Sequence, residues 1–83
     1  MTEVDIEAQI RDVLNGHARL AGDASSLALD ADLYQAGMSS HASVNVMLAL
    51  ENAFDIEFPD EMLTRDVFAS ISAIQVAVAD LRS

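Results

Sequence analysis

The sequence predicts an all-α protein, a four-helix bundle with a long loop between its first two helices and a short third helix. Apolar residues recur three or four positions apart along several stretches, which is the period of an amphipathic helix. Serines stand directly before two of these stretches, where a hydroxyl can cap the first turn. No convincing strand is found in the sequence. At 83 residues, the range 1–83 is expected to form a single domain.

The first helix is expected over residues 3–19, with Thr2 as its N-cap. The apolar side chains of its inner face are Ile6, Ile10, Val13 and Leu14, with Leu20 close to the same face. His17 also falls on this face, and we expect it at the rim of the core rather than as a ligand. Gly16 lowers the helix propensity of the second half.

A long loop is expected over residues 21–39, and such loops in compact domains are usually functional or held against the core. The side chains available to hold it are Leu27, Leu29, Leu33 and Tyr34. Asp30-Ala31-Asp32 resembles the start of a calcium loop, but the next oxygen ligand and the required glycine are missing. No metal site is therefore predicted.

The second helix is expected over residues 40–54, with Ser39 as its N-cap. At about 100° per residue, its side chains divide into two faces. The inner face comprises Val46, Met47, Leu50, Ala53 and Phe54, with Ala42 and Ser43 at its margin. The opposite face comprises Ser40, His41, Val44, Asn45, Leu48, Glu51 and Asn52.

Val44 and Leu48 are the large aliphatic residues of that opposite face, and they lie on the same side as Ser40. An aligned pair of apolar residues indicates a partner surface. The alternative is that the short third helix covers both side chains. The candidate partner-binding residues are therefore Ser39, His41, Val44, Asn45, Leu48, Glu51 and Asn52.

Pro59 favours a helix start, because proline suits the first helical position, and it predicts a short third helix over residues 60–66. Ser70 is expected to cap a last helix over residues 71–81. The inner side chains of that helix are Ile71, Ile74, Val78 and Leu81. Phe68 is expected to fill the core between these two helices.

The charge balance is strongly acidic, with fourteen acidic residues, four arginines, no lysine and a net charge of −10. Such a field opposes binding to nucleic acid and to anionic membranes. It favours docking onto basic patches of other proteins; the alternative is that the acids only keep an apolar chain soluble. The chain has no cysteine, so the polypeptide supplies no thiol and no disulfide.

The N-terminal residues lack the basic and apolar regions of a signal peptide. No apolar run approaches the roughly 18 residues that a transmembrane helix needs. A cytoplasmic, monomeric protein is the resulting expectation.

Enzyme signatures are missing from the sequence. The two histidines lie in different elements, and the three glycines are isolated rather than gathered in a phosphate-binding loop. Ser40 and His41 are not a nucleophile–base pair, because neighbours on a helix point about 100° apart. Ser40 is instead well placed to bear a phosphate, since backbone N–H groups and the helix dipole favour an anion at a helix start. We expect no catalytic activity.

The residues around Ser40 resemble the prosthetic-group site of the acyl carrier protein family, whose motif is usually Asp-Ser-Leu after a glycine. The matching residues here are Ser39-Ser40-His41, which follow Gly37. The downstream match comprises Val44, Val46, Leu48, Ala49-Leu50-Glu51, Phe54, Ile56 and Pro59-Asp60-Glu61. The resemblance covers most of the chain and implies the family's four-helix bundle. It also implies that a phosphopantetheinyl transferase attaches 4′-phosphopantetheine from coenzyme A to Ser40, and that the arm's thiol holds a cargo as a thioester.

Two departures from the family pattern bear on partners. Ser39 stands where an acid is usual and His41 where a leucine is usual, so Ser39 cannot lend a carboxylate to the transferase's Mg²⁺ site. Asn45 and Asn52 stand where acids are common, which leaves Glu51 as the acidic residue of this helix face. A partner that reads acids along this helix would bind weakly. A dedicated partner is therefore expected instead of a general fatty acid synthase.

The pattern Gly-x-Ser-Ser-x-Ala-Ser-Val with Phe-Asp-Ile-Glu-Phe-Pro-Asp is similar to small stand-alone carriers of certain bacteria. The resemblance implies loading with a small amino acid by an amino acid:carrier protein ligase, a homologue of class II aminoacyl-tRNA synthetases, and delivery to a downstream acceptor enzyme. Two alternatives stay open. One is an acyl carrier for fatty acid, polyketide or nonribosomal peptide synthesis, and the other is an unmodified acidic helical adaptor.

Overall fold

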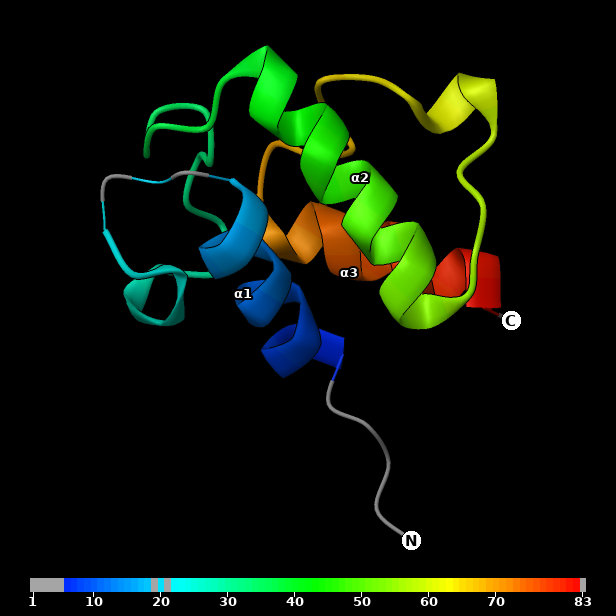
Figure 1. The fold of residues 1–83 in the computed structure, drawn as a ribbon, viewed down its shortest axis with the longest axis horizontal. Helices are drawn as coiled ribbons and strands as arrows, with labels where there is room; N and C mark the ends of the chain where they lie inside the picture. The colour runs from blue at the N-terminus through cyan, green and yellow to red at the C-terminus, as the bar shows by residue number, and fades with distance from the viewer. Residues whose placement is uncertain (1–5, 19, 21, 83) are drawn as a thin grey trace, which may run out of the picture.

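The computed structural model describes residues 6–18, 20 and 22–82 and shows three α-helices joined by loops (Figure 1). In chain order the elements are α1 (Ile6–His17), the 3₁₀ turn η1 (Ala24–Ser26), α2 (Ser40–Phe54), the 3₁₀ turn η2 (Asp60–Met62) and α3 (Ile71–Arg82). Among these residues there is no strand, as predicted. The expected cap Thr2 lies outside the described residues.

The core is built from all three helices and from the loops between them. α1 packs against both α2 and α3, and Figure 1 shows α2 crossing in front of α3. The largest fully buried side chains are Ile10, Leu14, Leu33, Met38, Val46, Leu50, Ile71, Ile74 and Val78. Burying each such side chain contributes about 1.5–3 kcal/mol, so this shared core holds the three helices together.

The long loop before α2 is held against the start of α3 by backbone hydrogen bonds. Leu33 donates its N–H to the Ala69 carbonyl at 2.7 Å, and Ser72 donates its N–H to the Leu29 carbonyl at 2.9 Å. The Leu33 side chain is fully buried, while Leu27 and Tyr34 pack against the core. The prediction for the Leu29 side chain is wrong, because that side chain is exposed and Leu29 holds the loop through its carbonyl instead.

Polar side chains of α1 fix the first part of the same loop. Arg11 donates from Nη1 to the carbonyls of Ala24 and Leu27, at 2.7 and 2.8 Å. Asn15 Oδ1 accepts the Ala24 N–H at 2.8 Å. These bonds tie the backbone of residues 24 and 27 to α1, so this part of the loop has a defined path toward α2.

The predicted third helix over residues 60–66 is wrong, because only the 3₁₀ turn η2 forms there. In the part of the chain that the structure describes, the fold has three α-helices rather than the expected four-helix bundle. Helical bonding stops after η2, since Leu63 adopts φ −86° and ψ 62°. Turns follow, with bonds from Phe68 N–H to the Arg65 carbonyl and from Ala69 N–H to the Asp66 carbonyl. Phe68 enters the core against Phe58, with ring centroids 5.3 Å apart. Burial of this ring outweighs the local preference for helix.

Two predictions of core position are also corrected, because Ala53 and His17 are exposed. The buried stripe of α2 is narrower than predicted: Ala42, Val46, Leu50 and Phe54, four residues apart, are its buried side chains. Ala53 lies one position outside that stripe. His17 is the last residue of α1. Both line a shallow hollow between α1 and α2.

Candidate functional site

The chain enters α2 through a turn that requires a glycine. Gly37 has φ 121°, which residues with a Cβ rarely adopt. Met38 N–H then donates to the Leu33 carbonyl at 3.0 Å, and the Met38 side chain is buried. The turn thus anchors residue 38 in the core and presents the next two residues at the surface.

Ser39 is the N-cap of α2, as predicted. Its backbone is extended, with φ −80° and ψ 167°, and its Oγ accepts the Ala42 N–H at 3.0 Å. One donor of the first turn is satisfied in this way, and the N–H groups of Ser40 and His41 remain directed out of the helix start.

Ser39→Ala should destabilise the protein by about 1 kcal/mol, the usual cost of losing a serine N-cap. Chemical denaturation followed by circular dichroism measures the change. Ser43→Ala is the matched control: the Ser43 hydroxyl donates to the Ser40 carbonyl at 2.6 Å but caps no N–H group, so a smaller loss is expected. Equal losses in the two variants would contradict the capping role.

Ser40 is the first residue of α2, and its side chain is exposed. Within the described part of the chain its hydroxyl makes no hydrogen bond, while the hydroxyls of Ser39 and Ser43 are both engaged. Of the three serines at this helix start, Ser40 therefore offers the hydroxyl that is most available for modification.

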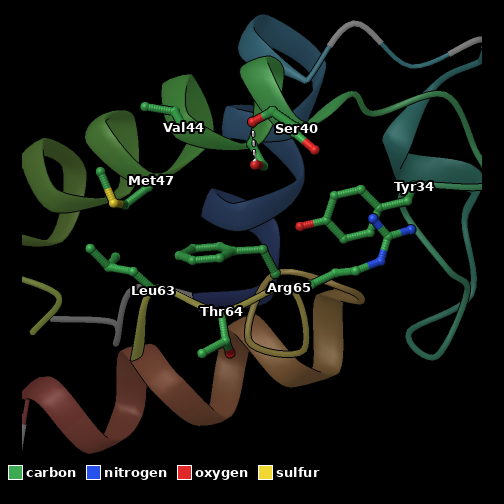
Figure 2. A pocket seen from close by; sticks show the side chains of 9 residues that line it. Tyr34, Ser40, Val44, Met47, Leu63, Thr64 and Arg65 are labelled. Atoms are coloured by element: carbon green, nitrogen blue, oxygen red, sulfur yellow. Dashed lines mark hydrogen bonds between the residues drawn. The ribbon is translucent and has the colours of Figure 1, made fainter. Parts of the chain in front are cut away.

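A cavity of about 490 Å³ opens beside Ser40, and we call it the Ser40 cavity. Its lining residues are Tyr34, Ser40, Ser43, Val44, Met47, Leu63, Thr64, Arg65 and Phe68. Figure 2 shows Val44, Met47 and Leu63 at one end and Ser40, Tyr34 and Arg65 at the other. The cavity thus has an apolar end and a polar end, and the serine hydroxyl lies at the polar one.

Arg65 stacks on Tyr34 at the polar end. The guanidinium carbon lies 3.9 Å from the centroid of the ring, within the range of a cation–π interaction. The two residues are 31 positions apart in the sequence. The helix predicted over residues 60–66 did not place Arg65 near Ser40. No sequence pattern signals this pair, because it forms only when the long loop and the turns before α3 come together.

The predicted partner face of α2 divides between two hollows. Val44 borders the Ser40 cavity, and its side chain is 49% exposed. Leu48 is 53% exposed and lines the hollow between α1 and α2, which measures about 570 Å³. Asn45, Asn52 and His17 line that second hollow too. The third-helix segment therefore leaves both aliphatic side chains accessible.

Glu51, another residue of the predicted partner face, has an internal role. Its Oε2 accepts the Phe58 N–H at 2.9 Å, and its carbonyl accepts the N–H groups of Asp55 and Ile56. Asp55 adopts the left-handed conformation, with φ 55°, which ends the helix. Glu51 thus fixes the exit from α2. His41 is exposed one residue beyond Ser40.

No group of three or more histidine, cysteine or acidic side chains could hold a metal ion among the residues that the structure describes. None of the described helices combines the length and the apolar character of a membrane-spanning segment.

Comparisons with known proteins give a consistent result. A family model described as "Phosphopantetheine attachment site" matches residues 8–74. An aminoacyl carrier protein of Agrobacterium fabrum is 51% identical over 73 residues, 88% of each chain. A D-alanyl carrier protein of Lactobacillus delbrueckii subsp. bulgaricus is 38% identical over 64 residues, 76% of each chain. These matches confirm the resemblance inferred from the sequence.

Solved structures give the same result for the fold. Two crystal structures contain an engineered Bradyrhizobium japonicum glycine:[carrier protein] ligase complexed with carrier protein from Agrobacterium tumefaciens. The match to the AMP complex has a TM-score of 0.85 at 51% identity and covers 88% of this chain and 97% of that chain. The match to the ATP complex has a TM-score of 0.87 at 49% identity and covers 90% and 97%.

Proposed function

Because the chain belongs to the family of phosphopantetheine attachment domains, we propose that Ser40 carries the 4′-phosphopantetheine arm transferred from coenzyme A. The observation that carries the proposal is the exposed, unbonded Ser40 hydroxyl between two serines whose hydroxyls are engaged. The polypeptide has no cysteine and so no thiol of its own. The arm supplies a terminal thiol, which holds a cargo as a thioester. Reactions on the cargo belong to partner enzymes.

The residues around Ser40 fit such a group chemically. A phosphodiester at the start of α2 is favoured by the unpaired N–H groups of the first turn and by the helix dipole. The Ser40 cavity adds a guanidinium and a phenol at its polar end, from Arg65 and Tyr34. Its apolar end suits the aliphatic part of an arm.

The proposed cargo is a small amino acid loaded by an amino acid:carrier protein ligase. Support comes from the relatives, an aminoacyl carrier protein and a D-alanyl carrier protein, and from the matches to carrier protein complexed with a glycine ligase. A phosphopantetheinyl transferase before loading and an acceptor enzyme after it complete the proposed partners. A single domain over residues 1–83, working as a cytoplasmic monomer, is the simplest form of this carrier.

The cargo is tested by converting the protein to the phosphopantetheine form and offering two loading systems. We expect a mass increase with the ligase, ATP and glycine or alanine. The apolar end of the Ser40 cavity is the observation that favours the alternative, an aliphatic acyl cargo. Loading by an acyl-activating enzyme with octanoate, but not by the ligase with either amino acid, would support that alternative. Failure of all modification by a transferase would favour the adaptor.

Leu48→Ala should raise the apparent KM of the ligase by roughly 5- to 30-fold, which corresponds to about 1–2 kcal/mol for an apolar side chain that fills a partner pocket. The side chain is 53% exposed in the free protein, so a small effect on unfolding is expected. Val76→Ala is the matched control, since Val76 is 71% exposed on α3 and belongs to neither hollow that borders α2. Unchanged loading by the Leu48 variant, or an equal loss in the Val76 variant, would argue against docking on this face.

A further inference from the structure

Arginines are the only basic residues of fixed charge in this chain, and each described one has a distinct environment. Arg11 is bonded to the Glu7 carboxylate and to two loop carbonyls. Arg82 lies over the Phe54 ring, 5.7 Å from its centroid. Arg65 has the Tyr34 ring as its neighbour, and no carboxylate within the described residues pairs with it. Arg65 also lines the cavity that Ser40 borders.

We propose that Arg65, held in place by Tyr34, pairs with the phosphodiester that links the arm to Ser40. This inference rests on the proposed attachment at Ser40 and assigns a binding role to residues outside the α2 motif. In a protein with a net charge of −10, an added anion meets a repulsive field. A guanidinium facing the same cavity offsets that repulsion locally.

The chemistry of the pair suits a phosphodiester better than it suits a carboxylate of the protein. A guanidinium presents several N–H donors in a planar fork that matches two phosphate oxygens. Stacking on Tyr34 restricts the guanidinium before the anion arrives, so less side-chain entropy is lost on pairing. Figure 2 shows the Tyr34 hydroxyl directed into the cavity, where it is a second donor for the same group.

The competing explanation is that Arg65 merely covers the Tyr34 ring and contributes to folding. A structural role of that kind affects the apo and the phosphopantetheine forms equally. A role toward the phosphodiester appears only after modification. The difference between the two forms therefore separates the explanations, in the manner of a double-mutant cycle.

Arg82→Gln is the matched control for Arg65→Gln. Both changes remove one positive charge from an arginine that stacks on an aromatic ring. Phe54 and Ser40 are the two ends of α2, and at 1.5 Å per residue that places Arg82 about 20 Å from the attachment point. Both variants share any effect of the lower overall positive charge. Only Arg65→Gln removes the proposed pairing with the phosphodiester.

The experiment compares apo and phosphopantetheine forms of the unchanged chain, Arg65→Gln, Arg65→Lys and Arg82→Gln, each checked by intact mass. We expect Arg65→Gln to lose roughly 2–4 °C from the holo-minus-apo difference in thermal midpoint, Arg65→Lys to lose less, and Arg82→Gln to match the unchanged chain. In ³¹P NMR, the phosphodiester resonance of holo Arg65→Gln should move toward its position in urea-unfolded protein.

Equal holo-minus-apo differences in all four chains, with an unmoved ³¹P resonance, would overturn the pairing while leaving attachment at Ser40 intact. The same loss in Arg82→Gln as in Arg65→Gln would also overturn it, because the effect would then be one of overall charge. If the unchanged chain gains no mass from a transferase and coenzyme A, the carrier function fails, and the pairing fails with it.

Discussion

Ser40→Ala should abolish the mass increase that a phosphopantetheinyl transferase and coenzyme A produce. The reason is chemical: the variant lacks the hydroxyl that forms the phosphodiester, and no other hydroxyl occupies the first position of α2. The fold should persist, because the Ser40 hydroxyl makes no hydrogen bond in the described chain and alanine is a better helix former than serine. Intact mass and circular dichroism measure the two results.

Ser39→Ala and Ser43→Ala are the controls for this loss. Both remove a neighbouring hydroxyl, and both keep the one at position 40. We expect both variants to be modified, with Ser39→Ala less stable because its hydroxyl caps Ala42 N–H. Modification of Ser40→Ala together with loss of modification in a folded Ser39→Ala would move the attachment point to Ser39.

Leu33→Ala should lower the free energy of unfolding by about 2–5 kcal/mol, the cost of removing a buried leucine side chain. Leu33 lies in the loop before α2, yet its side chain is 0% exposed and its N–H bonds to the Ala69 carbonyl. The shortened side chain leaves a cavity beneath the loop. Small domains are stable by only about 5–15 kcal/mol, so the loss is a large fraction of the total. Urea denaturation monitored by circular dichroism measures it.

Leu29→Ala is the control from the same loop. Its side chain is 40% exposed, and its contribution to holding the loop is made by the backbone carbonyl, which the substitution keeps. We expect a loss below about 1 kcal/mol. Similar losses for Leu33→Ala and Leu29→Ala would mean that the loop is only loosely attached to the core.

The sequence was most informative where local rules and the tertiary structure agree. α2 has the predicted bounds, because Ser39 supplies a cap and a regular apolar stripe follows it. α3 starts where Ser70 predicts, and Ser70 Oγ accepts the Ala73 N–H at 3.1 Å. α1 was predicted over 3–19, and its described helix is Ile6–His17.

The segment after Pro59 could not be predicted in the same way. Pro59 marks the start of a turn, as it should, but local sequence cannot show that the turn stops at Leu63. Burial of Phe68 against Phe58 decides that, and this contact joins segments on either side of η2. Tertiary packing overrides weak helix preference over so few residues.

The candidate site was likewise predictable only in part. Ser40 could be predicted from its position at a helix start and from the family motif around it, because both are read from neighbouring residues in the sequence. Arg65 and Tyr34 come from different loops, and the sequence contains no spacing rule for a stacked pair of this kind. The position of His17 in the hollow beside Leu48 was missed for a related reason. The helical period places His17 on the inner face of α1, but it does not show that the helix ends at this residue.

Different parts of α2 have different proposed roles. Its start presents the proposed attachment point beside the Ser40 cavity, and its middle exposes Leu48 to a partner. Its last turn is fixed by Glu51, whose carboxylate is bonded to Phe58 N–H. Hydrogen bonds from Ser39 and Glu51 fix the two ends of α2, so under the proposed docking at Leu48 the helix itself sets the distance to Ser40.

Attachment at Ser40 can be located by tandem mass spectrometry of the unchanged protein after incubation with a transferase and coenzyme A. Cleavage at acidic residues releases a peptide that contains Ser39, Ser40 and Ser43. We expect fragment ions in which the added mass first appears at Ser40. Added mass that first appears at Ser39 or Ser43 would contradict attachment at Ser40.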